Sequence, residues 1–148
     1  MLPWIERGTA TVPGDGAALR LMQRGSEFCI FAGRNPLMNS RQFGSEEDLA
    51  RLAWERIGTR KRPRLLIGGL GMGFTLRAAL ALVPAEVEIV VAELVPEVVA
   101  WARGPLAPLF DGCLDDPRVR IEIGDVGRLI AREKAGWDAI LLDVDNGP

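Results

Sequence analysis

Short apolar runs alternate with amphipathic segments along the chain from residue 64 onward. The runs predict buried strands, and apolar residues that recur every three or four positions predict helices. Strands that alternate with helices favour an α/β fold with a parallel, doubly wound sheet. The predicted strands are 64–67, 87–92, 119–123 and 138–142, the predicted helices are 75–83, 96–103 and a short one after residue 125, and the stretch that holds Leu106, Leu109, Phe110 and Cys113 is predicted to be a loop.

The chain before residue 44 has a different pattern. Short runs at 19–23 and 27–31 are separated by a turn at 24–26, and a second turn at 33–36 leads into a further short run. Runs of this length between turn residues predict strands. The first part of the chain is therefore predicted to be a small antiparallel β meander.

A helix is predicted directly after the meander. Ser45 is a candidate N-cap, the acidic residues 46–48 suit a first turn, and Gly58 is a candidate stop. We therefore divide the chain into a small N-terminal β meander, residues 1–44, and an α/β domain, residues 45–148.

Composition and charge exclude several classes of protein. The 148 residues include 18 basic and 20 acidic side chains, which gives a net charge of −2, and 48% are hydrophobic. These values are typical of a soluble globular chain and exclude intrinsic disorder and a basic tail that binds nucleic acid. The apolar runs are too short to span a membrane, and Glu6 and Arg7 stand where a signal peptide needs apolar residues. We expect a cytoplasmic protein with no membrane or nucleic-acid partner.

The residue types available also limit the chemistry. The sequence has no histidine and two cysteines, Cys29 and Cys113. This removes most transition-metal sites and any catalytic arrangement that depends on histidine. Chemistry is therefore expected from carboxylates, other polar side chains or a bound cofactor, and no metal is expected.

A glycine-rich loop follows the first predicted strand of the α/β domain and opens a helix. Gly69, Gly71 and Gly73 allow a tight turn there and let backbone N–H groups approach a ligand. A dinucleotide-binding motif that begins at Gly69 would need a small residue at position 74, where Phe74 stands. The loop therefore favours a nucleoside without a pyrophosphate, and a plain strand-to-helix turn is the alternative.

Carboxylates end the next two predicted strands. Glu93 lies 20 residues after Gly73, the usual distance for a carboxylate that accepts hydrogen bonds from ribose hydroxyls. Asp125 either caps the following helix or binds an adenine amino group, and the two roles are compatible. Leu94 and Val126, which directly follow these carboxylates, complete the predicted cofactor-binding residues.

Two further carboxylates follow the last predicted strand. Asp143 is a candidate general base or a ligand for a cationic substrate, and Asp145 is a candidate substrate-binding residue. A solvated strand end is the alternative for Asp143, and Mg²⁺ binding by the pair is a weaker third interpretation.

The motifs in this order resemble those of spermidine synthases and their bacterial relatives, within the S-adenosylmethionine-dependent methyltransferase fold. The resemblance covers residues 64–148, and the meander lies where that family keeps a small β domain. It implies a Rossmann-like doubly wound sheet, of which the first four strands are present, and a pocket for decarboxylated S-adenosylmethionine or the parent compound. The family pattern implies that Glu93 holds the ribose and Asp125 the adenine, and that Asp143 accepts a proton from an attacking amine. The segments that carry the resemblance are 65–69, Glu93 with 95–99, 115–120, 124–125 and 143–148.

The resemblance implies an aminopropyl transfer to a polyamine such as putrescine. The glycine loop lacks the aspartate with which that family holds the aminopropyl amine, and the chain has no tyrosine. An S-adenosylmethionine-dependent methyltransferase with another substrate is therefore an alternative, and a non-catalytic nucleoside-binding module is a second one. The family fold continues beyond the fourth strand, so we expect a truncated sheet whose apolar edge at 139–142 pairs with another chain, as in a homodimer.

Overall fold

The computed structural model describes residues 2–41, 44–133 and 136–142. The candidate residues Asp143 and Asp145 lie outside these ranges. No helix in the described ranges has the length and apolar character that a membrane span needs.

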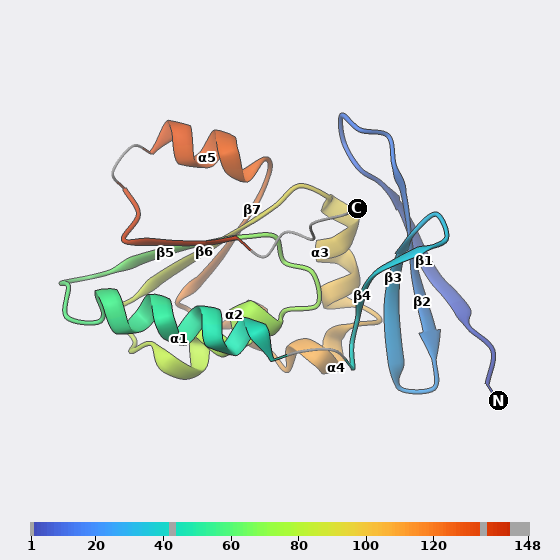
Figure 1. Cartoon of the computed structure of the whole chain (residues 1–148), viewed down its shortest axis with the longest axis horizontal. Coiled ribbons are helices and arrows are strands. Elements are labelled where there is room, and N and C mark those ends of the chain that lie inside the picture. Colours follow the sequence, from blue (N-terminus) through green and yellow to red (C-terminus); the bar gives the residue numbers. More distant parts are fainter. Residues whose placement is uncertain (1, 42–43, 134–135, 143–148) are drawn as a thin grey trace.

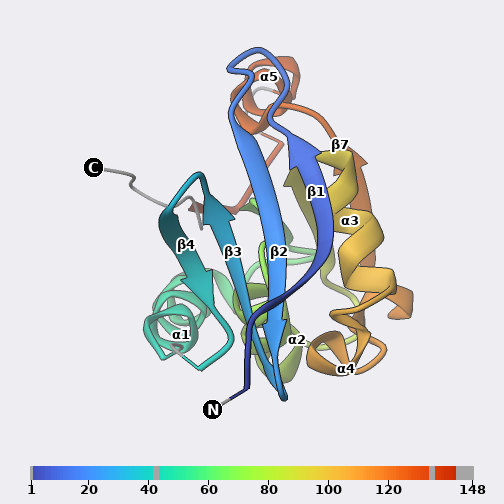
Figure 2. The same cartoon turned by 90° about the vertical axis from the view of Figure 1, so that its right-hand side faces the viewer.

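The N-terminal sheet is antiparallel, with its strands in the order β1-β2-β3-β4 (Figure 2). This confirms the predicted meander. The sequence pattern did not identify β1, which carries exposed residues along most of its length and so lacks a clear apolar alternation. The strands are β1 (Ile5–Thr11), β2 (Ala18–Arg24), β3 (Glu27–Ala32) and β4 (Asn35–Asn39).

The parallel sheet has the strand order β7-β6-β5-β8, and each neighbouring pair is parallel. The predicted parallel α/β architecture is therefore confirmed. The chain moves outward from β5 to β6 and β7, then returns to place β8 on the other side of β5. The strand order reverses between β5 and β8, which is where open α/β sheets bind ligands. The strands are β5 (Arg64–Gly68), β6 (Glu88–Glu93), β7 (Val119–Ile123) and β8 (Ala139–Leu142).

Helices cover both faces of the parallel sheet. Figure 1 shows α5 on one face and α1 and α2 on the other. Successive strand residues point to opposite faces, so Leu66 and Val90 pack with Leu129 of α5, whereas Leu65 and Ile67 belong to the larger cluster on the other face. The helices are α1 (Ser45–Ile57), α2 (Phe74–Leu82), α3 (Pro96–Arg103), α4 (Ala107–Phe110), the 3-10 turn η1 (Cys113–Asp115) and α5 (Val126–Arg132).

Two local predictions were wrong. The stretch predicted as a loop contains α4 and η1, which are too short to produce a helical repeat of apolar residues. Ser45 is not an N-cap, because Gly44 holds that position. The Gly44 N–H donates to Glu46 Oε2 at 2.9 Å, so the first acidic residue provides the hydrogen-bond acceptor at the start of the helix. Gly58 ends α1 as predicted.

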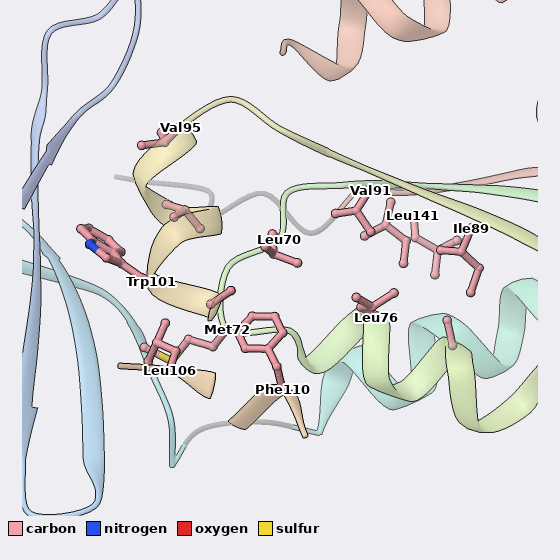
Figure 3. Close-up of a cluster of buried hydrophobic side chains, with 14 of the residues drawn as sticks. Leu70, Met72, Leu76, Ile89, Val91, Val95, Trp101, Leu106, Phe110 and Leu141 are labelled. Carbon is pink, nitrogen blue, oxygen red and sulfur yellow. The ribbon is translucent and has the colours of Figure 1, made fainter. Parts of the chain in front are cut away.

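A single hydrophobic cluster joins the two sheets. Leu21 and Ile30 of the N-terminal sheet belong to the same cluster as Leu70 and Phe110, and Figure 3 shows the part of this cluster that lies beside the parallel sheet. Trp101 of α3 faces β1 at Gly8, where a Cβ atom would collide with the indole ring. This packing fixes the N-terminal sheet beside the carboxyl ends of the parallel strands.

Candidate functional site

The glycine loop, residues 69–73, joins β5 to α2 with a backbone that requires glycine. Gly69, Gly71 and Gly73 have φ values of 94°, 51° and 84°, which other residues adopt only with strain. Gly73 is also the N-cap of α2, and a Cβ atom there would lie 2.5 Å from the Phe110 ring. The loop is therefore shaped both by its own backbone and by the packing beneath it.

Glu93, the last residue of β6, is buried with 7% of its surface exposed. The Leu70 N–H donates to Oε1 at 2.8 Å, and the Val95 N–H donates to Oε2 at 2.9 Å. These bonds offset part of the cost of burying a charge. The predicted ribose acceptor thus lies beside the glycine loop, as its position at the end of β6 requires.

Asp125 follows β7 and is the N-cap of α5. Its Oδ1 accepts a hydrogen bond from the Gly127 N–H at 2.7 Å. Of the two roles that the sequence left open, helix capping is therefore confirmed. The side chain is exposed, and Gly124, directly before it, donates its N–H to the Glu93 carbonyl at 2.9 Å. This bond holds the ends of β6 and β7 together.

These groups line one cavity of about 380 Å³ at the carboxyl ends of β5, β6 and β7. We call it the carboxyl-end cavity. Of the predicted binding residues, Gly73 is absent from the lining; it is the N-cap of α2, where a Cβ atom would meet the Phe110 ring. The predicted residues that do line it are Gly69, Gly71, Glu93, Leu94, Asp125 and Val126.

The opposite wall of the carboxyl-end cavity comes from the N-terminal sheet and the loop after β1. The Met38 sulfur lies 3.1 Å from where a Cβ atom at Gly71 would stand, so β4 reaches the glycine loop itself. Sequence reasoning missed this wall. The alternation of apolar residues in β2 and β3 marks an inward face, but the pattern does not say that this face meets a ligand site. The wall residues are Val12, Leu19, Ile30, Leu37 and Met38.

The charge of the carboxyl-end cavity is negative. Among the described residues that line it, Glu93 and Asp125 are charged, and the lining includes neither lysine nor arginine. Such a cavity favours a neutral or cationic ligand over a phosphate. The described residues also hold no group of three or more potential metal ligands.

A larger groove of about 690 Å³ lies between the start of α1 and α2. Its described lining includes no residue of the glycine loop, and neither Glu93 nor Asp125. We therefore assign the candidate site to the carboxyl-end cavity, because open α/β sheets bind ligands beyond the carboxyl ends of their strands.

Comparison of the sequence with known proteins finds one informative relative. No family model matches the chain. The chain is 34% identical over 89 residues to a polyamine aminopropyltransferase from Synechococcus sp. (strain JA-2-3B'a(2-13)), a match that covers 57% of this chain and 28% of the relative.

Comparison with solved structures finds the same fold. The spermidine synthase of Thermotoga maritima has a TM-score of 0.73 at 22% identity, over 97% of this chain and 48% of that chain. A spermidine synthase in complex with the transition state analogue AdoDATO has a TM-score of 0.71 at 22% identity, over 93% of this chain and 47% of that chain. A probable spermidine synthase from Corynebacterium glutamicum ATCC 13032 has a TM-score of 0.60 at 20% identity, over 95% and 53%.

The chain is thus similar to a polyamine aminopropyltransferase in its sequence over the matched residues, and to spermidine synthases in its Rossmann-like fold. It spans less than a third of the curated relative and about half of each of these structures. The N-terminal sheet is included in the structural match, because the alignment with the Thermotoga maritima enzyme covers nearly the whole chain.

Proposed function

We propose that this chain forms the nucleoside-binding part of a spermidine synthase-like aminopropyltransferase, which moves an aminopropyl group from decarboxylated S-adenosylmethionine to a polyamine such as putrescine. The observation that carries the proposal is the position of Glu93, buried beside the glycine loop in a cavity whose described lining includes no basic residue. The similarity to a polyamine aminopropyltransferase supports it independently.

The charge of the cavity supports the choice of donor. Decarboxylated S-adenosylmethionine carries a sulfonium and an ammonium group, whereas the parent compound also carries a carboxylate. Glu93 and Asp125 attract the two cations and repel a third carboxylate. In this proposal Glu93 accepts hydrogen bonds from the ribose hydroxyls, Asp125 accepts one from the adenine amino group, and Leu94 and Val126 flank the adenine.

The proposed reaction is a displacement at the carbon next to the sulfonium. The neutral amine of the acceptor forms a C–N bond, the C–S bond breaks, and its electron pair stays on the sulfur of methylthioadenosine. Asp143 accepts the proton that the amine must lose, since an alkylammonium cannot attack. Asp145 binds the remaining cationic end of the acceptor. Holding the amine in line with the reacting carbon supplies most of the acceleration.

The proposal is tested with the purified protein, decarboxylated S-adenosylmethionine and putrescine. Mass spectrometry is expected to detect spermidine and methylthioadenosine in equal amounts, and the Asp143→Asn variant is expected to form neither above background. Absence of both products from the unaltered protein, under conditions in which calorimetry shows that the donor binds, would contradict the proposed transfer.

One observation favours a second function. The glycine loop carries no carboxylate, so it offers no partner for the ammonium group of the decarboxylated donor. Intact S-adenosylmethionine carries its ammonium group next to its own carboxylate, so a methyltransferase depends less on such a partner. Calorimetry with both compounds distinguishes the two functions: tighter binding of the decarboxylated compound supports aminopropyl transfer, and tighter binding of the intact compound supports methyl transfer.

We also propose that two copies of the chain pair along β8. Within the described residues this strand forms one edge of the parallel sheet, and Ile140 and Leu142 on it are exposed. An exposed apolar edge strand presents unpaired backbone groups to another strand.

A further inference from the structure

We propose that Glu93 is a positioning residue that holds the glycine loop in its binding conformation, in addition to its role as ribose acceptor. The second role rests on the proposed function, whereas the first rests on the hydrogen bonds of the carboxylate itself.

Glu93 links two separate backbone segments through its side chain. Oε1 accepts the N–H of Leu70, in the middle of the glycine loop, and Oε2 accepts the N–H of Val95, at the start of α3. Both bonds run from neutral donors to a buried anion, a class of hydrogen bond stronger than that between neutral groups. The carboxylate therefore ties the loop after β5 to the turn after β6.

The main chain around Glu93 extends the same connection. The Gly69 N–H donates to the Ala92 carbonyl at 2.8 Å, and the Gly124 N–H donates to the Glu93 carbonyl at 2.9 Å. The first of these bonds holds Gly69, but Leu70 lies one residue further on, where the side chain of Glu93 provides the contact. The conformation of the loop at Leu70 thus depends on a charged oxygen at position 93.

The two roles are compatible because a carboxylate has more acceptor sites than the backbone uses. An ionised carboxylate offers about four lone-pair sites. The bonds from Leu70 and Val95 occupy one site on each oxygen. Glu93 also lines the carboxyl-end cavity, so the remaining site on each oxygen is available to one hydroxyl of a ribose diol.

Glutamine at position 93 tests whether the two backbone hydrogen bonds need both oxygens of the carboxylate. Its oxygen can accept one of the two backbone N–H groups, but its NH₂ group faces the other as a second donor. Glu93→Gln should therefore release either Leu70 or Val95. Glu97→Gln is the matched control. It replaces a carboxylate by an amide in the same way, but Glu97 is exposed on α3 and does not line the cavity.

The experiment compares binding of adenosine and 2′,3′-dideoxyadenosine, which lacks both ribose hydroxyls. We expect Glu93→Gln to weaken binding of both nucleosides, by roughly tenfold or more for adenosine, while Glu97→Gln changes neither. If Glu93 acted on the ribose alone, the dideoxy compound would bind Glu93→Gln as tightly as the unaltered protein, and this result would overturn the positioning role.

Amide hydrogen exchange provides a measurement that needs no ligand. In the free protein, Leu70 and Val95 are expected to be protected, and Glu93→Gln is expected to lose protection at one or both. Unchanged protection at both amides would overturn the proposal. Failure of the unaltered protein to bind any nucleoside would refute the proposed function and leave the exchange result to decide the positioning role. If Glu93→Gln does not fold, Glu93→Asp, which keeps the charge but is too short to reach both amides, is expected to lose protection at one of them.

Discussion

The two described carboxylates of the candidate site differ in what the fold requires of them. Glu93 is buried, and both of its oxygens accept backbone hydrogen bonds. Asp125 is exposed and uses Oδ1 to cap α5. A substitution of either residue therefore changes both structure and charge, and the two effects must be separated by the choice of variant.

Asp125 allows this separation. Asp125→Ala removes the cap and is expected to lower the free energy of unfolding by about 1 kcal/mol. Asp125→Asn keeps an oxygen that accepts the Gly127 N–H, so its unfolding free energy should stay close to that of the unaltered protein. Urea denaturation measures both. Equal stability of the alanine and asparagine variants would contradict the role of this side chain as a cap.

The site residues that the sequence predicts are those with a local signal. Glu93 and Asp125 each end a predicted strand, and parallel strands bring their carboxyl ends to one edge. Leu19 and Met38 carry no such signal, because their place in the cavity wall depends on how the N-terminal sheet packs against the rest of the molecule. The roles of Asp143 and Asp145 remain predictions, since both lie outside the described residues.

At the scale of elements, the junction of the glycine loop with α2 depends on the packing of α4. Gly73→Ala meets two costs: a positive φ of 84° and a contact of 2.5 Å with the Phe110 ring. Gly14 has the same φ, and no atom lies within 4 Å of where its Cβ atom would stand, so Gly14→Ala isolates the first cost. We expect Gly14→Ala to lower the unfolding free energy by about 1 kcal/mol, and Gly73→Ala by at least about 2 kcal/mol more than that.

Denaturation of the two glycine variants measures the difference. Gly73→Ala should also weaken nucleoside binding, since the loop must shift to relieve the contact, whereas Gly14→Ala should bind normally. Equal losses of stability in the two variants would show that Phe110 does not constrain the loop.

The end of α2 is held by the side chain of Arg118, the residue directly before β7. Arg118 Nη1 donates to the carbonyls of Leu80 and Val83, and Nη2 donates to Asp116 Oδ2 at 2.8 Å. The hydrogen bonds from Arg118 lower the pKa of Asp116 to about 2. Asp116 thus holds the guanidinium where it can donate to the carbonyls at the helix end.

This lowered pKa gives the stability a defined dependence on pH. An aspartate in an unfolded chain has a pKa of about 3.9, so the contribution of Asp116 is complete above about pH 4 and is lost as the pH falls towards 2. Asp116→Asn removes the titrating group, and its stability should therefore fall less than that of the unaltered protein over this range. Urea midpoints from pH 6 to pH 2 test this, with the exposed neighbour Asp115→Asn as the control. Identical acid profiles for Asp116→Asn and the unaltered protein would contradict it.

The elements that the sequence predicts are those with a clear pattern of apolar positions. The strands and helices from β5 to β8 follow clear apolar patterns, and the structure places them as predicted apart from α4 and η1. β1 was not identified, because its place in the N-terminal sheet is fixed by pairing with β2 and by the fit of Trp101 at Gly8. Neither of these long-range contacts has a local signature in the sequence.

At the scale of the whole molecule, both sheets share one hydrophobic cluster, and the carboxyl-end cavity lies between them. The edge of the parallel sheet at β8 differs from this packed region. β8 pairs with β5 on one side and, within the described residues, with no strand on the other. Its residue Leu141 is buried under the face that carries α1 and α2, whereas Ile140 is 41% exposed.

The unpaired edge of β8, as seen within the described residues, predicts self-association of this chain along β8. We expect sedimentation velocity over a series of concentrations to show a monomer–dimer equilibrium, and Ile140→Lys to shift it towards monomer, because lysine on an edge strand opposes pairing with a second strand. The substitution should cost little stability, since the side chain is already partly exposed. Leu52→Lys, at a 54% exposed position on α1, is the matched control and should leave association unchanged. An equal shift in the two variants would place the interface elsewhere, and a dimer that Ile140→Lys does not weaken would exclude pairing along β8.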